Sequence, residues 1–244
     1  EATARQVMAR MVASGWLQHE RVGRAVHYRL TERAQRRFAE ARPLNAHLMR
    51  PEPEETEWVL LLVTVPPERQ SVRHRLRRRL AAGGWGSVGP SAWLGTSPRC
   101  EIGLARTLDE LELCGSELLL RGDLVRGDPK ALAARAWDLD SINERYRAFT
   151  TDFGPLVAHD DREAFRARTA MIDAWHRSFN SDPHLPADLL PADWCGQEAR
   201  EVVRRQSDEW TEAAARWWRD VSERTRGDGA ASLSRRAASA AAMR

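Results

Sequence analysis

The first 30 residues carry polar side chains of the types that proteins use to contact nucleic acid. Seven of them are candidate DNA contacts: Thr3, Arg5, Gln6, Arg10, Arg21, Arg24 and His27. Arg and Gln can form paired hydrogen bonds with the edges of guanine and adenine, and Thr can contact a base methyl group. Arg also binds backbone phosphates. We therefore expect these side chains to form a DNA-contacting surface.

A helix followed by a two-stranded hairpin would position these side chains. Val7, Met8, Met11 and Val12 have the spacing of one apolar helical face, and Gly15 supplies a C-cap. Residues 16–31 then alternate with a period of two around a turn at 22–24, and Thr31 has the position of an N-cap. Helix and hairpin together predict part of a winged helix-turn-helix. Its helix would lie in the major groove and its wing against phosphates.

The charge distribution favours the same interpretation. Residues 1–50 contain ten Arg and four acidic residues, a net charge of +6, whereas the whole chain has +3. The basic excess therefore lies on the candidate DNA-contacting part, as expected of a nucleic-acid-binding domain. The alternative for this stretch is a solvated helix beside an ordinary hairpin.

Length and composition predict a soluble protein of two or three domains. The chain has 244 residues, of which 42% are hydrophobic and 30% charged. Three widely spaced cysteines predict neither a disulfide framework nor a zinc site, which favours the cytoplasm. We expect no membrane association, because no apolar run is long enough to span a bilayer. The preference for Arg over Lys suggests a bacterial source.

The middle of the chain predicts a ferredoxin-like domain over 57–128, after a Pro-rich linker at 43–56. The strand at 57–65 is nearly all apolar, so we expect both of its faces to be buried. The other predicted elements are a helix at 67–82, a hairpin of 85–88 and 92–94 with a strand-like stretch at 101–104, a helix at 106–114 and a strand at 117–125.

The rest of the chain predicts an all-helical domain over 129–226 and a disordered tail over 227–244. One of its helices would be capped by Asp140, and another would close the domain over 197–221. With the DNA-contacting part and its connecting helix assigned to 1–42, the predicted fold class is α+β.

No catalytic motif is present, and we predict no catalytic or metal-binding residue. Gly84, Gly86 and Gly89 fit the spacing G-x-G-x-x-G, but a helix precedes them and a strand follows, the reverse of a dinucleotide site. Walker A, H-E-x-x-H and G-x-S-x-G motifs do not occur. The sequence therefore predicts a protein without enzymatic activity or a cofactor.

Four stretches resemble the PaaX family, bacterial repressors of phenylacetate catabolism. They are GWLQHERVGRAVHYRLT, EWVLLLVTVPPERQSVRHRLRRRLAAGGWG, AWDLDSINERYRAF and DPHLPADLLPADWCGQEA, in this order along the chain. The resemblance implies a homodimer on a palindromic double-stranded operator. It also implies release by an acyl-CoA effector, typically phenylacetyl-CoA.

Such an effector needs arginines for its phosphates and an aromatic slot for its aryl end. Five residues of the helical domain have suitable side chains: Arg166, Trp175, His176, Arg177 and Trp194. The alternative is that they belong to the core or to an interface.

Two other functions stay open on sequence grounds. The first is a protein-interaction or scaffolding module in which the N-terminal hairpin contacts a partner. The second is a metal-dependent nuclease, because the middle domain is similar to the ferredoxin-like nuclease subunits of CRISPR adaptation. Those nucleases need an acidic residue at the end of the first strand. Here the strand ends in Thr64-Val65-Pro66, which argues against cleavage.

Overall fold

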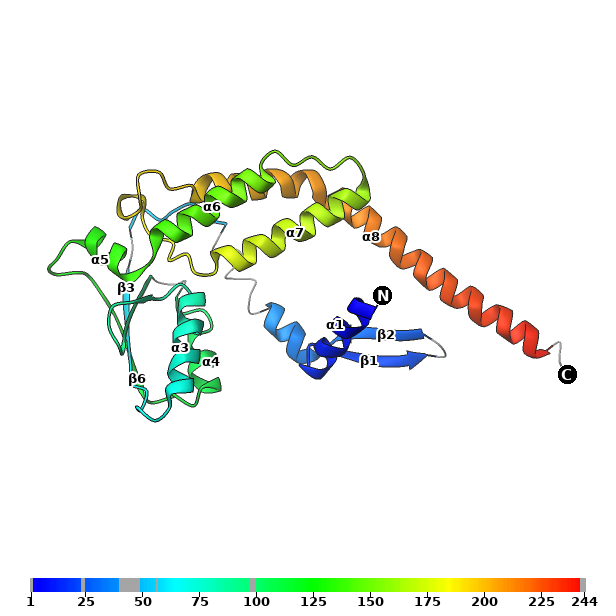
Figure 1. Ribbon diagram of the computed structural model, residues 1–244, viewed down its shortest axis with the longest axis horizontal. Helices are drawn as coiled ribbons and strands as arrows, with labels where there is room; N and C mark the ends of the chain where they lie inside the picture. Colours follow the sequence, from blue (N-terminus) through cyan, green and yellow to red (C-terminus); the bar gives the residue numbers. More distant parts are fainter. Residues whose placement is uncertain (1, 23–24, 40–48, 56, 97–99, 242–244) are drawn as a thin grey trace. The chain divides into compact units, whose positions relative to one another are not determined.

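A computed structural model of the chain describes residues 2–22, 25–39, 49–55, 57–96 and 100–241 (Figure 1). The chain divides into two compact units. Unit 1 comprises Glu1–Pro43 and Ala215–Arg244, and unit 2 comprises Leu44–Ala214. Within the described residues, no helix combines the length and the apolar character that crossing a membrane requires.

Unit 1 begins with helix α1, Ala2–Ala13, whose end is defined by Gly15. Gly15 has a φ of 72°, in the left-handed region that glycine adopts at little cost. The N–H groups of Gly15 and Trp16 donate to the carbonyls of Val12 (3.0 Å) and Met11 (2.9 Å). These are the two hydrogen bonds of a Schellman motif, so the predicted C-cap at Gly15 is confirmed.

The predicted hairpin follows directly. Strands β1 (Leu17–Val22) and β2 (Ala25–Leu30) are antiparallel, and residues 32–39 are helical. Thr31 caps this helix, because its Oγ1 accepts a hydrogen bond from the N–H of Ala34 at 3.1 Å. The predicted cap is therefore confirmed.

Much of the apolar surface of unit 1 is exposed. Among its described residues Ala34 is a buried hydrophobic, and seven larger apolar side chains are 36% exposed or more: Val7, Trp16, Val26, Tyr28, Leu30, Phe38 and Trp218. Trp16 and Phe38 touch edge to face, with ring centroids 5.9 Å apart. The unit therefore gains little of the free energy that burial of apolar surface provides.

Unit 2 starts with a four-stranded antiparallel sheet and two helices. The elements in chain order are β3 (Trp58–Val63), α3 (Gln70–Ala82), β4 (Gly86–Ser87), β5 (Ala92–Thr96), α4 (Leu104–Glu110) and β6 (Glu117–Gly122). The strand order is β4-β5-β3-β6, with β3 in the interior and β6 at one edge. This β-α-β-β-α-β order is the ferredoxin-like arrangement that the sequence predicted.

Burial of β3 differs from the prediction. Val59, Leu61 and Val63 are fully buried against α3 and α4, whereas the alternate residues of β3 are only half-buried. The strand is therefore not buried on both faces, because helices α3 and α4 cover one face of the sheet. On edge strand β6, Leu118 and Leu120 are 63% and 54% exposed.

Several predicted boundaries in this domain were wrong. Helix α4 spans Leu104–Glu110 and not 106–114, and β6 ends at Gly122 and not at residue 125. Helix α3 begins at Gln70 and not at residue 67, because the N–H of Arg69 bonds to the carbonyl of Pro66 in a preceding turn. The stretch 101–104 is not a strand. The N–H of Leu104 bonds to the carbonyl of Glu101 at 3.1 Å, which makes a turn that leads into α4.

From residue 129 onward the described elements are helices. They are α5 (Pro129–Ala136), α6 (Leu139–Phe153), α7 (Asp161–Phe179), the short 3-10 helix η1 (Ala187–Leu189) and α8 (Gly196–Ala241). Asp138 and not Asp140 caps α6, because its carboxylate accepts the N–H of Ser141 at 3.1 Å. An N-cap residue lies just outside the helix, and Asp140 is already inside the first turn.

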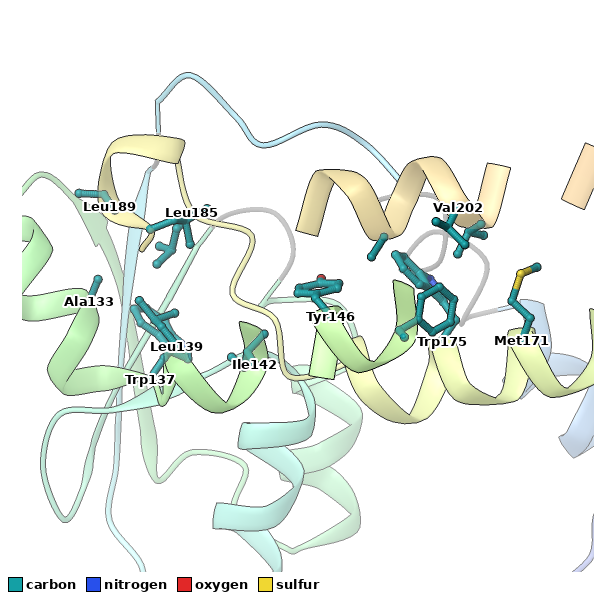
Figure 2. Close-up of a cluster of buried hydrophobic side chains, with 14 of the residues drawn as sticks. Ala133, Trp137, Leu139, Ile142, Tyr146, Met171, Trp175, Leu185, Leu189 and Val202 are labelled. Carbon is teal, nitrogen blue, oxygen red and sulfur yellow. The ribbon is translucent and has the colours of Figure 1, made fainter. Parts of the chain in front are cut away.

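The helical part surrounds an aromatic core (Figure 2). Tyr146 and Met171 are completely buried, and Trp175 is 4% exposed. Trp175 packs edge-on against Phe149, with ring centroids 5.5 Å apart, and tilts toward Tyr146 at 6.3 Å. Large aromatic side chains contribute most to such a core because each removes a large apolar area from water.

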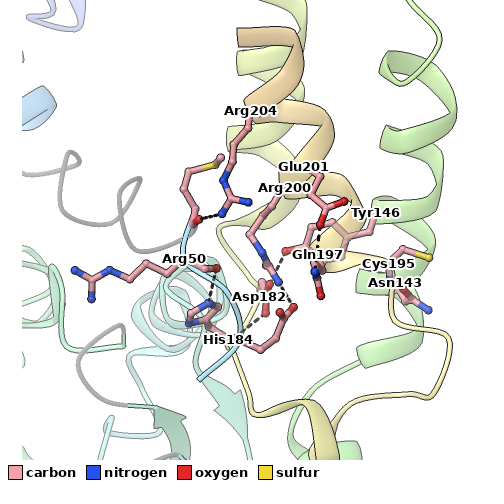
Figure 3. Close-up of polar contacts among 12 residues, drawn as sticks. Arg50, Asn143, Tyr146, Asp182, His184, Cys195, Gln197, Arg200, Glu201 and Arg204 are labelled. Carbon is pink, nitrogen blue, oxygen red and sulfur yellow. Dashed lines mark hydrogen bonds and ion pairs between the residues drawn. The ribbon is translucent and has the colours of Figure 1, made fainter. Parts of the chain in front are cut away.

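A buried ion pair joins the segment before β3 to the start of α8 (Figure 3). The guanidinium group of Arg200 pairs with the carboxylate of Glu52, and their side chains are 2% and 13% exposed. Burial lowers the pKa of Arg200 to about 10, and the charge of Arg204 adds to this effect. The guanidinium group therefore remains protonated at neutral pH.

Two further hydrogen bonds hold the same segment. Arg204 donates to the backbone carbonyl of Met49 at 2.6 Å, and Nε2 of His184 lies 3.2 Å from the carbonyl oxygen of Arg50 (Figure 3). Residues 49–52, which fall within the predicted linker at 43–56, are therefore attached to the helical part of unit 2.

Helix α8 is longer than the sequence predicted. The expected helix ended at residue 221 and was followed by a disordered tail from residue 227, whereas α8 continues to Ala241. The Ala- and Arg-rich composition of the tail explains the difference, because these residues have the highest helix propensities.

Candidate functional site

Helix α1 presents its candidate DNA contacts in two directions. Thr3, Arg5, Gln6 and Arg10 are all exposed. At about 100° per residue, Thr3, Gln6 and Arg10 fall within about 60° of one another, and Arg5 lies about 100° from Gln6. The structure therefore brings three of the four side chains onto one face, with Arg5 to the side of it.

The hairpin also separates its candidate contacts. Directly opposed residues of an antiparallel pair point to the same face, and Arg21 is paired with Val26 and His27 with Glu20. Arg21 therefore shares the apolar face, and His27 lies on the polar face opposite a carboxylate. The alternation of faces that the sequence predicted for β2 follows from this register. Arg24, the candidate at the hairpin tip, lies outside the described residues.

The five candidate effector residues differ in their surroundings. Trp175 is a core residue, and Trp194 packs edge-on against Tyr146 at 5.4 Å. Arg166 and Arg177 are exposed, and Arg177 pairs with Asp173 one helical turn away at 2.8 Å. His176 is half-buried on the same helix.

A cavity of about 270 Å³ lies elsewhere in unit 2, between α3, β4 and β5 on one side and α5 and α6 on the other. Its walls include three buried tryptophans, namely Trp85, Trp93 and Trp137. Arg77 of α3 and Arg145 of α6 also line it, with Asp138 and three serines. None of the five candidate effector residues is among its lining residues.

Sequence reasoning did not single out the cavity-lining residues. They come from three segments between residues 77 and 181, and no local spacing relates them. The only sequence signal for the cavity was the high content of Trp and Arg in these segments. This signal is not specific, because Trp is also common in ordinary cores and Arg on solvated helix faces.

Comparisons with known proteins identify all three parts of the chain. A model described as "PaaX-like protein" matches residues 1–34, one described as "PaaX protein central Cas2-like domain" matches 51–133, and one described as "PaaX-like protein C-terminal domain" matches 137–220. The chain belongs to the PaaX family. The resemblance stated from the four sequence stretches is thereby confirmed.

Two relatives of this PaaX-family chain are informative. It is 28% identical over 220 residues to the transcriptional repressor PaaX of Escherichia coli K12, an alignment that covers 83% of this chain and 66% of the repressor. Among solved structures, the uncharacterized protein Rv0674 from Mycobacterium tuberculosis has a TM-score of 0.59 at 24% identity. That match covers 87% of this chain and 82% of Rv0674, and it shows that the two share a fold.

The Cas2-like central domain of this PaaX-family chain lacks a carboxylate where β3 ends. Residues Thr64 and Val65 follow β3, and no group of three or more potential metal ligands occurs among the described residues. Metal-dependent hydrolysis requires such a group to hold the ion. The central domain therefore resembles Cas2 in its fold, without the strand-end ligand expected of a nuclease.

Proposed function

We propose that this chain is a DNA-binding transcriptional repressor that controls an operon for the degradation of a phenylacetate-like aromatic acid. The observation that carries the proposal is the ordered match of three PaaX models along the chain, together with its similarity to a transcriptional repressor. We propose a regulator and not an enzyme, acting in the bacterial cytoplasm.

The basic N-terminal part supports DNA binding through a winged helix. Residues 1–50 have a net charge of +6, and the exposed face of Thr3, Gln6 and Arg10 carries the side chains that can contact base edges. Arg21 on the hairpin would contact phosphates. Because each phosphate contact releases counterions, the affinity for DNA should fall steeply with salt.

A homodimer on a palindromic operator fits the exposed surface of β6. This strand is at the edge of the sheet, and Leu118 and Leu120 present apolar side chains to solvent. An exposed apolar edge strand is a surface on which a second chain can pack. Two copies related by a twofold axis would place two α1 helices on the two halves of a palindrome.

Release by an aryl-acetyl-CoA thioester, such as phenylacetyl-CoA, completes the proposed mechanism. An effector releases a repressor only if it binds more tightly to a conformation that has low affinity for the operator. The effector would therefore favour a dimer whose α1 helices no longer match the spacing of the two half-sites.

The first test is a titration of a labelled fragment of the chain's own promoter by fluorescence anisotropy. Random DNA of the same length is the control. Both DNAs are titrated at two salt concentrations, with and without phenylacetyl-CoA. We expect promoter binding at least about 10³-fold tighter than binding to random DNA, with loss of binding when the thioester is added.

The outcomes separate the parts of the proposal. Promoter binding that the thioester does not change would retain the repressor and reject this effector. Equal, weak and salt-independent interaction with both DNAs would reject DNA recognition and favour a protein-interaction module.

A further inference from the structure

The cavity between the sheet and the α5–α6 helices is suited to a single aromatic ring with a short linker. Its volume is about 270 Å³. For comparison, an apolar cavity of about 150 Å³ can hold benzene. The remaining volume is enough for the acyl group that connects a ring to a carboxylate or a thioester.

The tryptophans of the cavity offer apolar ring surface. The indole N–H of Trp85 already donates to the carbonyl of Cys100 at 2.8 Å, and that of Trp137 to the carbonyl of Gly84 at 3.0 Å. Because these polar groups are satisfied by backbone, the two side chains present carbon surface to the cavity. Aromatic rings pack favourably against such surfaces in offset or edge-on geometry.

The polar groups of the cavity favour an anion. Arg145 is half-buried and donates to Oγ of Ser181 at 3.1 Å, which orients its guanidinium group toward residues that line the cavity. Arg77 adds a second positive charge, and Asp138 supplies one negative charge. With two guanidinium groups and one carboxylate, the charged side chains that line the cavity have a net positive charge, which favours an anionic ligand.

Helix α3 extends this positive surface beyond the cavity. Arg75, Arg77 and Arg78 are exposed on it, and no ion pair holds any of the three among the described residues. Of these three arginines, Arg77 lines the cavity, so it is placed to bind a phosphate of a ligand whose aryl end is inside.

We propose that this cavity binds the aryl-acyl end of an anionic ligand, with the ring among Trp85, Trp93 and Trp137 and the acyl oxygen on Arg145. The anion is either the carboxylate of the free aryl-acetic acid or the phosphates of its CoA thioester, which Arg77 of α3 would bind. The inference rests on the proposed function, since it assigns a location to the effector of the repressor.

The test fills the cavity without removing any contact. Ala81 lines the cavity but is exposed on α3, so Ala81→Phe adds an aromatic ring at the mouth of the cavity. The control is Ala82→Phe, which adds the same ring at a neighbouring exposed position that does not line the cavity. Binding to the full chain is measured by isothermal titration calorimetry with phenylacetate, phenylacetyl-CoA and CoA alone. Arg145→Gln tests the cationic contact, and Arg166→Ala tests the alternative surface on α7.

We expect Ala81→Phe to weaken binding of the aryl ligand at least about tenfold, and Ala82→Phe to change it less than about twofold. Arg145→Gln should weaken binding about tenfold, because a charge-assisted hydrogen bond is lost. Tighter binding of the thioester than of phenylacetate would show that the CoA part contributes to binding, and equal binding would show that it does not. The location is tested by the Ala81→Phe and Arg145→Gln variants.

Three results would overturn the inference. The first is that Ala81→Phe and the unaltered chain bind the aryl ligand with equal affinity. The second is that only Arg166→Ala loses affinity for the aryl ligand. The third is that CoA alone binds as tightly as phenylacetyl-CoA. The operator titration is run on the same preparations. If the protein binds its promoter but the cavity variants do not change ligand affinity, only the location of the ligand site is rejected. If the protein binds the ligand but not the promoter, the proposed function is rejected.

Discussion

Trp137 donates a hydrogen bond from its indole N–H to the backbone carbonyl of Gly84, at 3.0 Å, and so joins the α5–α6 corner to the sheet domain. The same indole stacks on Trp58 of β3, with ring centroids 6.3 Å apart. Gly86 also packs closely against Trp137, since an added Cβ at Gly86 would lie 2.7 Å from Cε2 of Trp137. Trp137 therefore contributes to the contact between the sheet and the helical part of unit 2.

Gly86→Ala should disturb this contact. We expect a loss of about 1–3 kcal/mol in the free energy of unfolding, because the new methyl group forces Trp137 or β4 to move. Urea unfolding followed by tryptophan fluorescence measures it. Gly89→Ala is the matched control, since its Cβ would meet its nearest neighbour at an ordinary 3.6 Å. Equal stability of the two variants would contradict the close packing at Gly86.

Glu52→Gln should leave the charge of Arg200 buried without its partner. We expect a loss of about 3–5 kcal/mol in unfolding free energy, since an unpaired buried charge is strongly destabilising. Arg147→Ala removes an exposed pair with Asp193 and should cost only about 0–1 kcal/mol. Chemical denaturation of both variants distinguishes the cases. A Glu52→Gln protein as stable as the unaltered chain would show that the pair does not stabilise the segment.

Asp138→Ala should cost about 1 kcal/mol of stability at neutral pH through the loss of the α6 cap. The hydrogen bonds from Ser141, and then the charge of Arg145, lower the pKa of Asp138 below 3.8. Its carboxylate therefore stabilises the fold above pH 3.8, and this contribution is lost as the pH falls through the lowered pKa. Thermal unfolding between pH 3 and pH 7 should show the two proteins converging at low pH.

The control for this prediction is Asp140→Ala, which changes the residue that the sequence had suggested as the cap. We expect it to change the stability by less than about 0.5 kcal/mol. A larger effect at position 140 than at position 138 would contradict the capping geometry.

Leu118→Glu combined with Leu120→Glu should convert the proposed dimer to a monomer, because two carboxylates on edge strand β6 oppose the packing of a second copy. Light scattering after size exclusion measures the mass, and circular dichroism verifies the fold. Val125→Glu is the control, since Val125 is 97% exposed and lies outside β6. A double variant that stays dimeric places the interface elsewhere.

Gln6→Ala should reduce discrimination between operator and random DNA by about tenfold or more, because Gln6 shares the exposed face of α1 with Thr3 and Arg10. Arg21→Ala should weaken binding to both DNAs by similar factors and lower the salt slope by about 1. Arg5, to the side of that face, should behave like Arg21. Anisotropy titrations over a salt series decide this, and a specific loss at Arg5 with none at Gln6 would reverse the assignment.

Much of the local structure was predictable from the sequence, because short-range chemistry determines it. Gly15 ends α1 through its left-handed φ, Thr31 caps the helix at 32–39, and the period-two pattern of β2 gives its two faces. The ferredoxin-like order followed from alternating strand and helix patterns. The Asp140 cap and the strand-like stretch at 101–104 were wrong because the exact ends of elements depend on individual hydrogen bonds that near-neighbour spacing does not determine. The predicted end of α8 was wrong because Ala and Arg in the tail have high helix propensities.

The sequence by itself determined the family, the order of elements and the basic N-terminal part, since each depends on residue type and near-neighbour spacing. Only the tertiary structure decided which aromatic and charged residues meet. Trp175 became core, Arg166 remained on the surface, and Trp137 closed a cavity with residues from α3 and β5. These contacts form between segments that are distant in the sequence, and they depend on the shape and volume of many side chains at once. They therefore produce no periodic pattern in the sequence.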